Sequence, residues 1–148
     1  MDDAQEFARR ARARHAEWSH AEPLLARLVA TGHEAWLVGG LVRDLWLERP
    51  AGDVDLATDA RPEALVAIFP EAIPTGLRHG TVTVLSEGHP VEITTFRADR
   101  DYSDARHPDR VEFVRTIEED LARRDFTVNA MALDPAGERF VDPWGRRD

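Results

Sequence analysis

The chain contains no cysteine and no lysine, and each absence removes whole classes of chemistry. Without cysteine there is no disulfide, no catalytic thiolate and no cysteine-bound zinc. Without lysine there is no P-loop contact to phosphate, no nucleotide carried on a lysine side chain and no Schiff base. All 19 basic residues are therefore arginines.

The polar, charged N-terminal residues predict no signal peptide, and the sequence shows no apolar segment long enough to cross a membrane as a helix. Together with the absence of cysteine, this predicts a cytoplasmic protein with no membrane partner. The net charge of −9 argues against a strong, non-specific nucleic-acid binder, because such proteins usually present a basic face. A length of 148 residues predicts one domain.

The most informative stretch is residues 37–58, LVGGLVRDLWLERPAGDVDLAT. Its pattern predicts a strand at 35–38, a turn at Gly39 and Gly40, a short helix at 41–47 and a second strand at 53–57. Side chains alternate along a strand, so Asp53 and Asp55 share one face. Two neighbouring carboxylates repel each other unless cations or protons offset their charge, and oxygen ligands of this kind suit Mg²⁺ or Mn²⁺.

The two glycines predict a phosphate site next to these carboxylates. A turn that leads into a helix presents free backbone N–H groups and the positive end of the helix dipole. Arg43 in the predicted helix adds a cation for the same phosphates, or alternatively pairs with a nearby acid as a structural residue. Metal-binding carboxylates beside a phosphate cradle indicate chemistry on a nucleoside triphosphate.

The motif formed by Gly39-Gly40, Arg43-Asp44 and Asp53-x-Asp55 resembles the signature of the polymerase β-like nucleotidyltransferases. A second block, RRDFTVNAM at residues 123–131, is similar to a motif of the class II tRNA nucleotidyltransferases (CCA-adding enzymes) and their poly(A) polymerase relatives. The resemblance implies that Arg124, Asp125 and Asn129 face the nucleotide, with Asp125 accepting a hydrogen bond from a ribose hydroxyl. From the residues alone, Asp125 is equally suited to cap a helix at 126–133.

Glu92 is the candidate for a third carboxylate. Residues 81–85 and 91–97 read as two strands of a hairpin, and Glu92 and Thr94 share one face of the second strand. A position next to the strand of Asp53 and Asp55 would bring Glu92 alongside them, and the resemblance implies an acidic residue here. The alternative is a solvent-facing glutamate on an edge strand.

The stretch at 98–110 has almost no apolar residues and no period, so it reads as a mobile loop. Further on, Thr116 is expected to cap a helix with Glu119 three residues later. Glu119 with Arg123, and Asp120 with Arg124, have the spacing of surface ion pairs on that helix.

The expected fold is α/β (α+β) of the polymerase β-like kind, a small mixed sheet of about four or five strands with helices on one side. Residues 1–33 form an N-terminal helical segment, and residues 34–148 form a catalytic core. The resemblance implies that this single nucleotidyltransferase head domain lacks the neck, body and tail of the longer family members.

The resemblance implies addition of CMP and AMP from CTP and ATP to the 3′ end of tRNA. Mg²⁺ or Mn²⁺ would be held by Asp53, Asp55 and Glu92, and phosphates by Gly39, Gly40 and Arg43. The alternative is a head that binds NTP and metal but is inactive on RNA without further domains or a partner. A small-substrate nucleotidyltransferase is a third possibility, against which the RRDFTVNA block speaks.

Overall fold

The computed structural model describes residues 16–39, 42, 54–102, 108–122, 132–133 and 140–141, together with Glu6 and Arg9. In chain order its elements are α2 (Ala16–Ala30), β1 (Ala35–Val38), β2 (Val54–Thr58), α4 (Pro62–Ile68), β3 (Ile73–Gly76), η1 (Leu77–His79), β4 (Thr81–Ser86), β5 (His89–Thr95), β6 (Arg97–Tyr102), β7 (Pro108–Phe113), α5 (Ile117–Leu121), β8 (Ala132–Leu133) and β9 (Phe140–Val141). None of the described helices is long and apolar enough to span a membrane.

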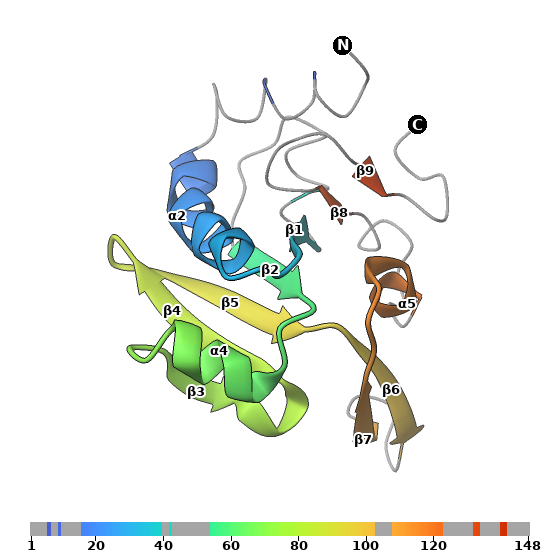
Figure 1. The fold of residues 1–148 in the computed structure, drawn as a ribbon. Helices are drawn as coiled ribbons and strands as arrows, with labels where there is room; N and C mark the ends of the chain where they lie inside the picture. Colours follow the sequence, from blue (N-terminus) through green and yellow to red (C-terminus); the bar gives the residue numbers. More distant parts are fainter. Residues whose placement is uncertain are drawn as a thin grey trace.

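The main sheet has seven strands in the order β3-β4-β5-β2-β1-β8-β9 (Figure 1). The β2–β5 pair is parallel, and the other pairs are antiparallel. The prediction of about four or five strands was therefore too low. β8 and β9 have two residues each, which is too short for an alternating pattern to reveal. β8 also shows that the helix predicted at 126–133 does not reach Ala132.

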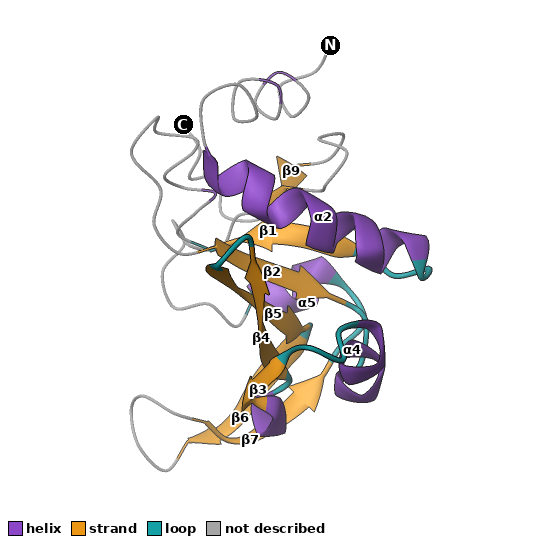
Figure 2. Cartoon of the chain, turned by 90° about the vertical axis from the view of Figure 1, so that its left-hand side faces the viewer, coloured by secondary structure: helices purple, strands orange, loops and turns teal. Residues whose placement is uncertain are grey.

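Helices cover both faces of this sheet, and not one face as the sequence suggested (Figure 2). Alternate residues of β1 and β2 enter two separate apolar clusters, as the period of a strand requires. The first cluster joins Leu37 and Leu56 to α2 and α4, and the second joins Trp36 and Ala57 to α5. The short α5 was predicted from its capping signal, but its side of the sheet was not predictable from local pattern.

The stretch at 98–110 that was read as a mobile loop contains most of β6 and the first half of β7, an antiparallel pair that forms a second sheet of two strands. Arg97 pairs with Phe113 and Tyr102 with Pro108, while residues 103–107 lie outside the described part. The prediction failed because the bonds of this ladder join backbone groups, which leave no mark on the hydrophobic period. Figure 1 shows the pair leaving the main sheet at the end of β5.

The turn after α2 sets the position at which β1 begins. Gly32 has φ +88°, and the N–H groups of Gly32 and His33 donate to the carbonyls of Val29 and Leu28, the pattern of a Schellman motif. The chain is then joined to the end of β2, because the Glu34 N–H donates to the Asp59 carboxylate at 3.0 Å. These bonds hold β1 and β2 in step, and thereby place Asp55.

Arg27 of α2 connects that helix to the end of α4. Its guanidinium lies 4.3 Å from the centroid of the Phe69 ring, and it donates to the Glu71 carboxylate at 2.6 Å and to the Ile68 carbonyl. We expect Arg27→Ala to lower the free energy of unfolding by about 2 kcal/mol, because a cation–π contact, a hydrogen bond and an exposed ion pair are all lost. Urea denaturation measures this.

Glu71→Gln is the matched control, since it removes the ion pair but leaves the contacts of Arg27 with Phe69 and Ile68. We expect a loss of about 0.5 kcal/mol. The hydrogen bond from Arg27 lowers the pKa of Glu71. Its stabilisation is therefore present above the usual pKa of a glutamate and lost as the pH falls through the lowered value. A loss for Glu71→Gln as large as that for Arg27→Ala would contradict this division.

Candidate functional site

Asp55 and Glu92 lie directly opposite each other on neighbouring strands. β2 and β5 run parallel, and their register pairs Val54 with Val91, Asp55 with Glu92 and Leu56 with Ile93. The apolar partners on both sides of the pair belong to the first cluster, so Asp55 and Glu92 point to the other face. The position that the sequence suggested for Glu92, alongside the strand of Asp55, is the observed one.

The surroundings of this pair suit a hard cation. Asp55 is half-buried and Glu92 is exposed. Neighbouring strands lie about 4.8 Å apart, which brings two like charges close together. Carboxylate oxygens are the ligands that Mg²⁺ and Mn²⁺ prefer. Within the described residues no group of three or more potential ligands occurs. Asp53, the further carboxylate that the sequence predicts here, lies outside them.

Gly39 lies at the same end of the paired strands β1 and β2 as Asp55. It follows β1 directly, and the register of β1 with β2 places Val38 opposite Asp55. Gly39 is buried, has φ +76° and accepts a hydrogen bond from the N–H of Val42 at 3.1 Å. A left-handed backbone of this kind favours glycine, so the residue type is required by the turn. The predicted phosphate turn therefore begins beside the carboxylate pair.

The remaining predicted site residues lie outside the described part of the chain: Gly40, Arg43, Asp53, Arg124, Asp125 and Asn129. The elements that flank the RRDFTVNAM block are described. Before it, the Thr116 hydroxyl accepts from the Glu119 N–H at 3.2 Å, which confirms the predicted cap of α5. After it, β8 pairs with β1, with Ala132 opposite Val38. Ala132 packs in the same apolar cluster as α5. The elements at both ends of the block therefore meet on the face of the sheet that carries the second cluster, which is also the face of Asp55.

Sequence reasoning placed Thr94 on the face of Glu92 but missed the threonines of β3 and β4 next to them. Thr83 of β4 is the antiparallel partner of Glu92, and its hydroxyl lies 2.8 Å from that of Thr75. The Thr81 and Thr94 hydroxyls lie 2.9 Å apart in the next row. The alternation TVTV at 81–84 was the available signal, since it places valines on one face and hydroxyls on the other. The carboxylate pair therefore continues into a neutral polar surface.

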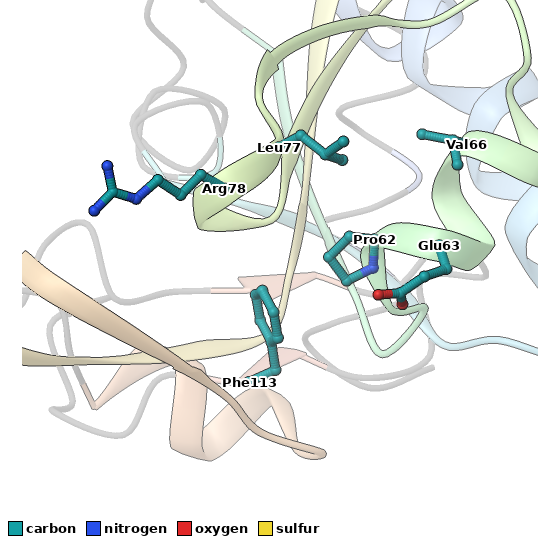
Figure 3. Close-up of a pocket in the computed structure, with 6 residues that line it drawn as sticks. All are labelled: Pro62, Glu63, Val66, Leu77, Arg78 and Phe113. Atoms are coloured by element: carbon teal, nitrogen blue, oxygen red, sulfur yellow. The ribbon is translucent and has the colours of Figure 1, made fainter.

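A separate cavity of about 450 Å³ lies between α4, η1 and β7 (Figure 3). It is lined by Pro62, Glu63, Val66, Leu77, Arg78 and Phe113. Figure 3 shows the Arg78 side chain extending away from the other lining residues. This cavity contains none of the predicted site residues. Its mostly apolar lining suits neither a metal ion nor a triphosphate.

A comparison with protein families gives the assignment. The family described as the poly(A) polymerase head domain matches residues 35–148. The chain belongs to this family. The match begins at β1 and includes the carboxylate pair, the Gly39 turn and the RRDFTVNAM block.

The chain is similar to curated CCA-adding enzymes of Bacillus species. One from Bacillus cereus is 55% identical over 120 residues, which is 81% of this chain and 30% of the relative. One from Bacillus cytotoxicus is 50% identical over 131 residues, 88% of this chain and 33% of the relative. The chain thus spans about a third of the length of these relatives.

Solved structures confirm the polymerase β-like nucleotidyltransferase fold of the head domain. The Bacillus stearothermophilus CCA-adding enzyme in complex with CTP has a TM-score of 0.78 and 47% identity, covering 89% of this chain and 31% of that one. A tRNA nucleotidyltransferase complexed with a primer tRNA and an incoming ATP analog has a TM-score of 0.59 and 26% identity, covering 82% and 34%.

The repulsion between Asp55 and Glu92 leads to a prediction about stability. Without divalent cations, we expect Glu92→Gln to raise the free energy of unfolding by about 0.5 kcal/mol, because one of two opposed like charges is removed. Mg²⁺ should raise the melting temperature of the wild-type chain more than that of this variant. Thermal melts in EDTA and in Mg²⁺ measure both effects. Glu63→Gln, which removes an exposed carboxylate of α4, should give neither; a gain of the same size there would contradict the local origin of the effect.

Proposed function

We propose that this chain is the catalytic head of a metal-dependent tRNA nucleotidyltransferase of the CCA-adding type. It would transfer CMP and AMP from CTP and ATP to the 3′ end of tRNA. The observation that carries the proposal is the Asp55–Glu92 pair beside the Gly39 turn. This pair occurs in a chain of which 81% aligns with a CCA-adding enzyme at 55% identity. The names of two solved relatives, with CTP and with a primer tRNA and an ATP analog, support these substrates.

In this proposal the residues of the chain position reactants and balance charge. Asp53, Asp55 and Glu92 would hold Mg²⁺ or Mn²⁺, which would neutralise charge on the triphosphate and lower the pKa of the attacking hydroxyl. The Gly39-Gly40 turn and Arg43 bind the outer phosphates, and Arg124, Asp125 and Asn129 bind the nucleotide.

The proposed reaction needs no protein nucleophile. The 3′-oxygen of the RNA forms a bond to the α-phosphorus, and the bond to pyrophosphate breaks. Positioning and electrostatic stabilisation supply the catalysis. This agrees with a chain that has no cysteine and no lysine.

A second candidate is a head that binds NTP and metal but does not transfer to RNA without further domains or a partner. The observation that favours it is the span of the match, which is about a third of each relative. The two candidates share the carboxylate and phosphate sites, so they differ in transfer and not in NTP binding.

Incubation of the 148-residue chain with Mg²⁺, one labelled NTP at a time and tRNA lacking its 3′ end separates these candidates. We expect incorporation of CMP or AMP. Asp55→Asn should reduce it by about 100-fold or more, as expected when a charge-stabilising group is removed from a reaction centre. Glu63→Gln should incorporate normally.

The outcomes of this assay are distinct. NTP binding without incorporation would favour the second candidate. Full activity of Asp55→Asn, with its folding verified by circular dichroism, would contradict the metal assignment.

Two glycines with similar backbones test the phosphate site. Gly39 has φ +76° and lies beside Asp55, whereas Gly88 has φ +81° and lies in the β4–β5 turn, where an added Cβ would meet no atom within 4 Å. Alanine at either position should lower the free energy of unfolding by about 1 kcal/mol because of the left-handed backbone.

We expect Gly39→Ala also to weaken NTP binding by about tenfold, since it disturbs the phosphate turn, and Gly88→Ala to leave binding unchanged. Calorimetric titration with CTP and ATP in Mg²⁺ measures this. Equal affinities of the two variants would remove Gly39 from the phosphate site.

A further inference from the structure

Asp120, which the site described above does not use, is a fully buried carboxylate. It lies near the end of α5 and has no exposed surface. Among the residues that the structure describes, it is the one charged side chain in the buried set. Burial of a carboxylate is unfavourable unless hydrogen bonds stabilise it, so this position requires a specific explanation.

Asp120 accepts a hydrogen bond at the junction between the two sheets. Its Oδ2 lies 3.0 Å from the backbone nitrogen of Arg97, the first residue of β6. Next to it, the N–H of Phe96 donates to the Thr58 carbonyl at the end of β2, and the N–H of Val114 donates to the Phe96 carbonyl. Asp120 therefore binds α5 to the point where β2, β5 and β6 come together.

The Arg97 side chain extends the same connection to η1. Its Nη1 donates to the carbonyl of His79 at 3.0 Å. The β5–β6 junction, whose Arg97 N–H donates to Asp120, is thus held by hydrogen bonds to several segments. It therefore gives α5 a fixed point of attachment.

This hydrogen bond supplies what apolar packing of α5 does not. Ile117 and Leu121 pack with Trp36, Val38 and Ala57 on the face of the sheet that bears Asp55. Apolar contacts are non-directional, so on a helix of five residues they permit small rotations and shifts. A hydrogen bond at 3.0 Å is directional and favours one orientation.

We propose that Asp120 is a positioning residue for nucleotide binding. By fixing the last turn of α5 against the β5–β6 junction, it sets the place from which the chain enters the RRDFTVNAM block three residues later. The sequence suggested a place on the exposed face of the helix, but the side chain has no exposed surface. The inference rests on the proposed function, because it assumes that the block binds the nucleotide.

Two substitutions separate the hydrogen bond from the charge. Asp120→Asn removes the charge but retains an oxygen that accepts from the Arg97 N–H, and Asp120→Ala removes the acceptor. Ile117→Val is the structural control, since it loosens the packing of α5 but leaves the hydrogen bond. Affinity for CTP and ATP is measured by calorimetry with Mg²⁺ on the 148-residue chain, well below the melting temperature of each variant.

We expect Asp120→Ala to weaken NTP binding by about tenfold, the asparagine to restore affinity to near the wild-type value, and Ile117→Val to bind as the wild type does. If the alanine variant does not fold, Asp120→Glu takes its place. It keeps the charge but displaces the acceptor by one methylene, and it should also weaken binding.

The opposite results overturn the inference. Wild-type affinity of a folded Asp120→Ala would show a role in stability alone. Equal weakening by Ile117→Val would assign the effect to general loosening of α5. Failure of the proposed function is recognised separately, because the wild-type chain itself would then not bind NTP.

Discussion

The parallel pairing of β2 with β5 is the constraint on which the rest of the structure depends. β2 lies in the interior of the main sheet, with β1 on one side and β5 on the other. The pair with β1 brings the Gly39 turn to Asp55, and the pair with β5 brings Glu92. Side chains alternate along a strand, so a slip of one residue in either pair would send a functional group to the opposite face.

The two faces of the sheet differ in the polarity of their side chains and in the elements that cover them. α2 and α4 cover the first face, where their leucine and alanine side chains pack on valine, leucine and isoleucine side chains of the strands and form most of the apolar core. The second face is covered by α5 over β1 and β2, while β4 and β5 present Glu92 and threonine hydroxyls there. Of the described residues, Asp55, Glu92 and the threonines next to Glu92 lie on this face, which is why the proposed metal site is placed there.

Three settings illustrate how position decides the use of a carboxylate. Asp55 and Glu92 lie opposite each other, where two like charges come close together, and we propose that they share a divalent cation. Asp120 is fully buried and accepts from a backbone N–H, which gives it a part in orienting α5. Surface carboxylates such as Glu71 pair with arginine and contribute modestly to stability.

Much of this protein was predictable where the signal is local. The strand before Gly39, the hairpin of β4 and β5 and the Thr116 cap each depend on a few consecutive residues. The position of Glu92 was suggested only with the help of a resemblance, because the pairing of strands that are distant in sequence leaves no local trace.

Tertiary structure alone decided the rest. β8 is a strand because it pairs with β1, β9 because it pairs with β8, and the β6–β7 ladder depends on backbone groups that no side-chain pattern records. The spacing of Asp120 and Arg124 suggested a surface ion pair on the helix. In the structure the Asp120 side chain is buried and accepts a hydrogen bond from the Arg97 N–H. The sequence by itself determined which residue types are available for chemistry, and it indicated those elements whose signal lies in a few consecutive residues, such as β1, the β4–β5 hairpin and the cap of α5. Which of them meet was determined by long-range pairing and burial, since these depend on contacts between segments that are far apart along the chain.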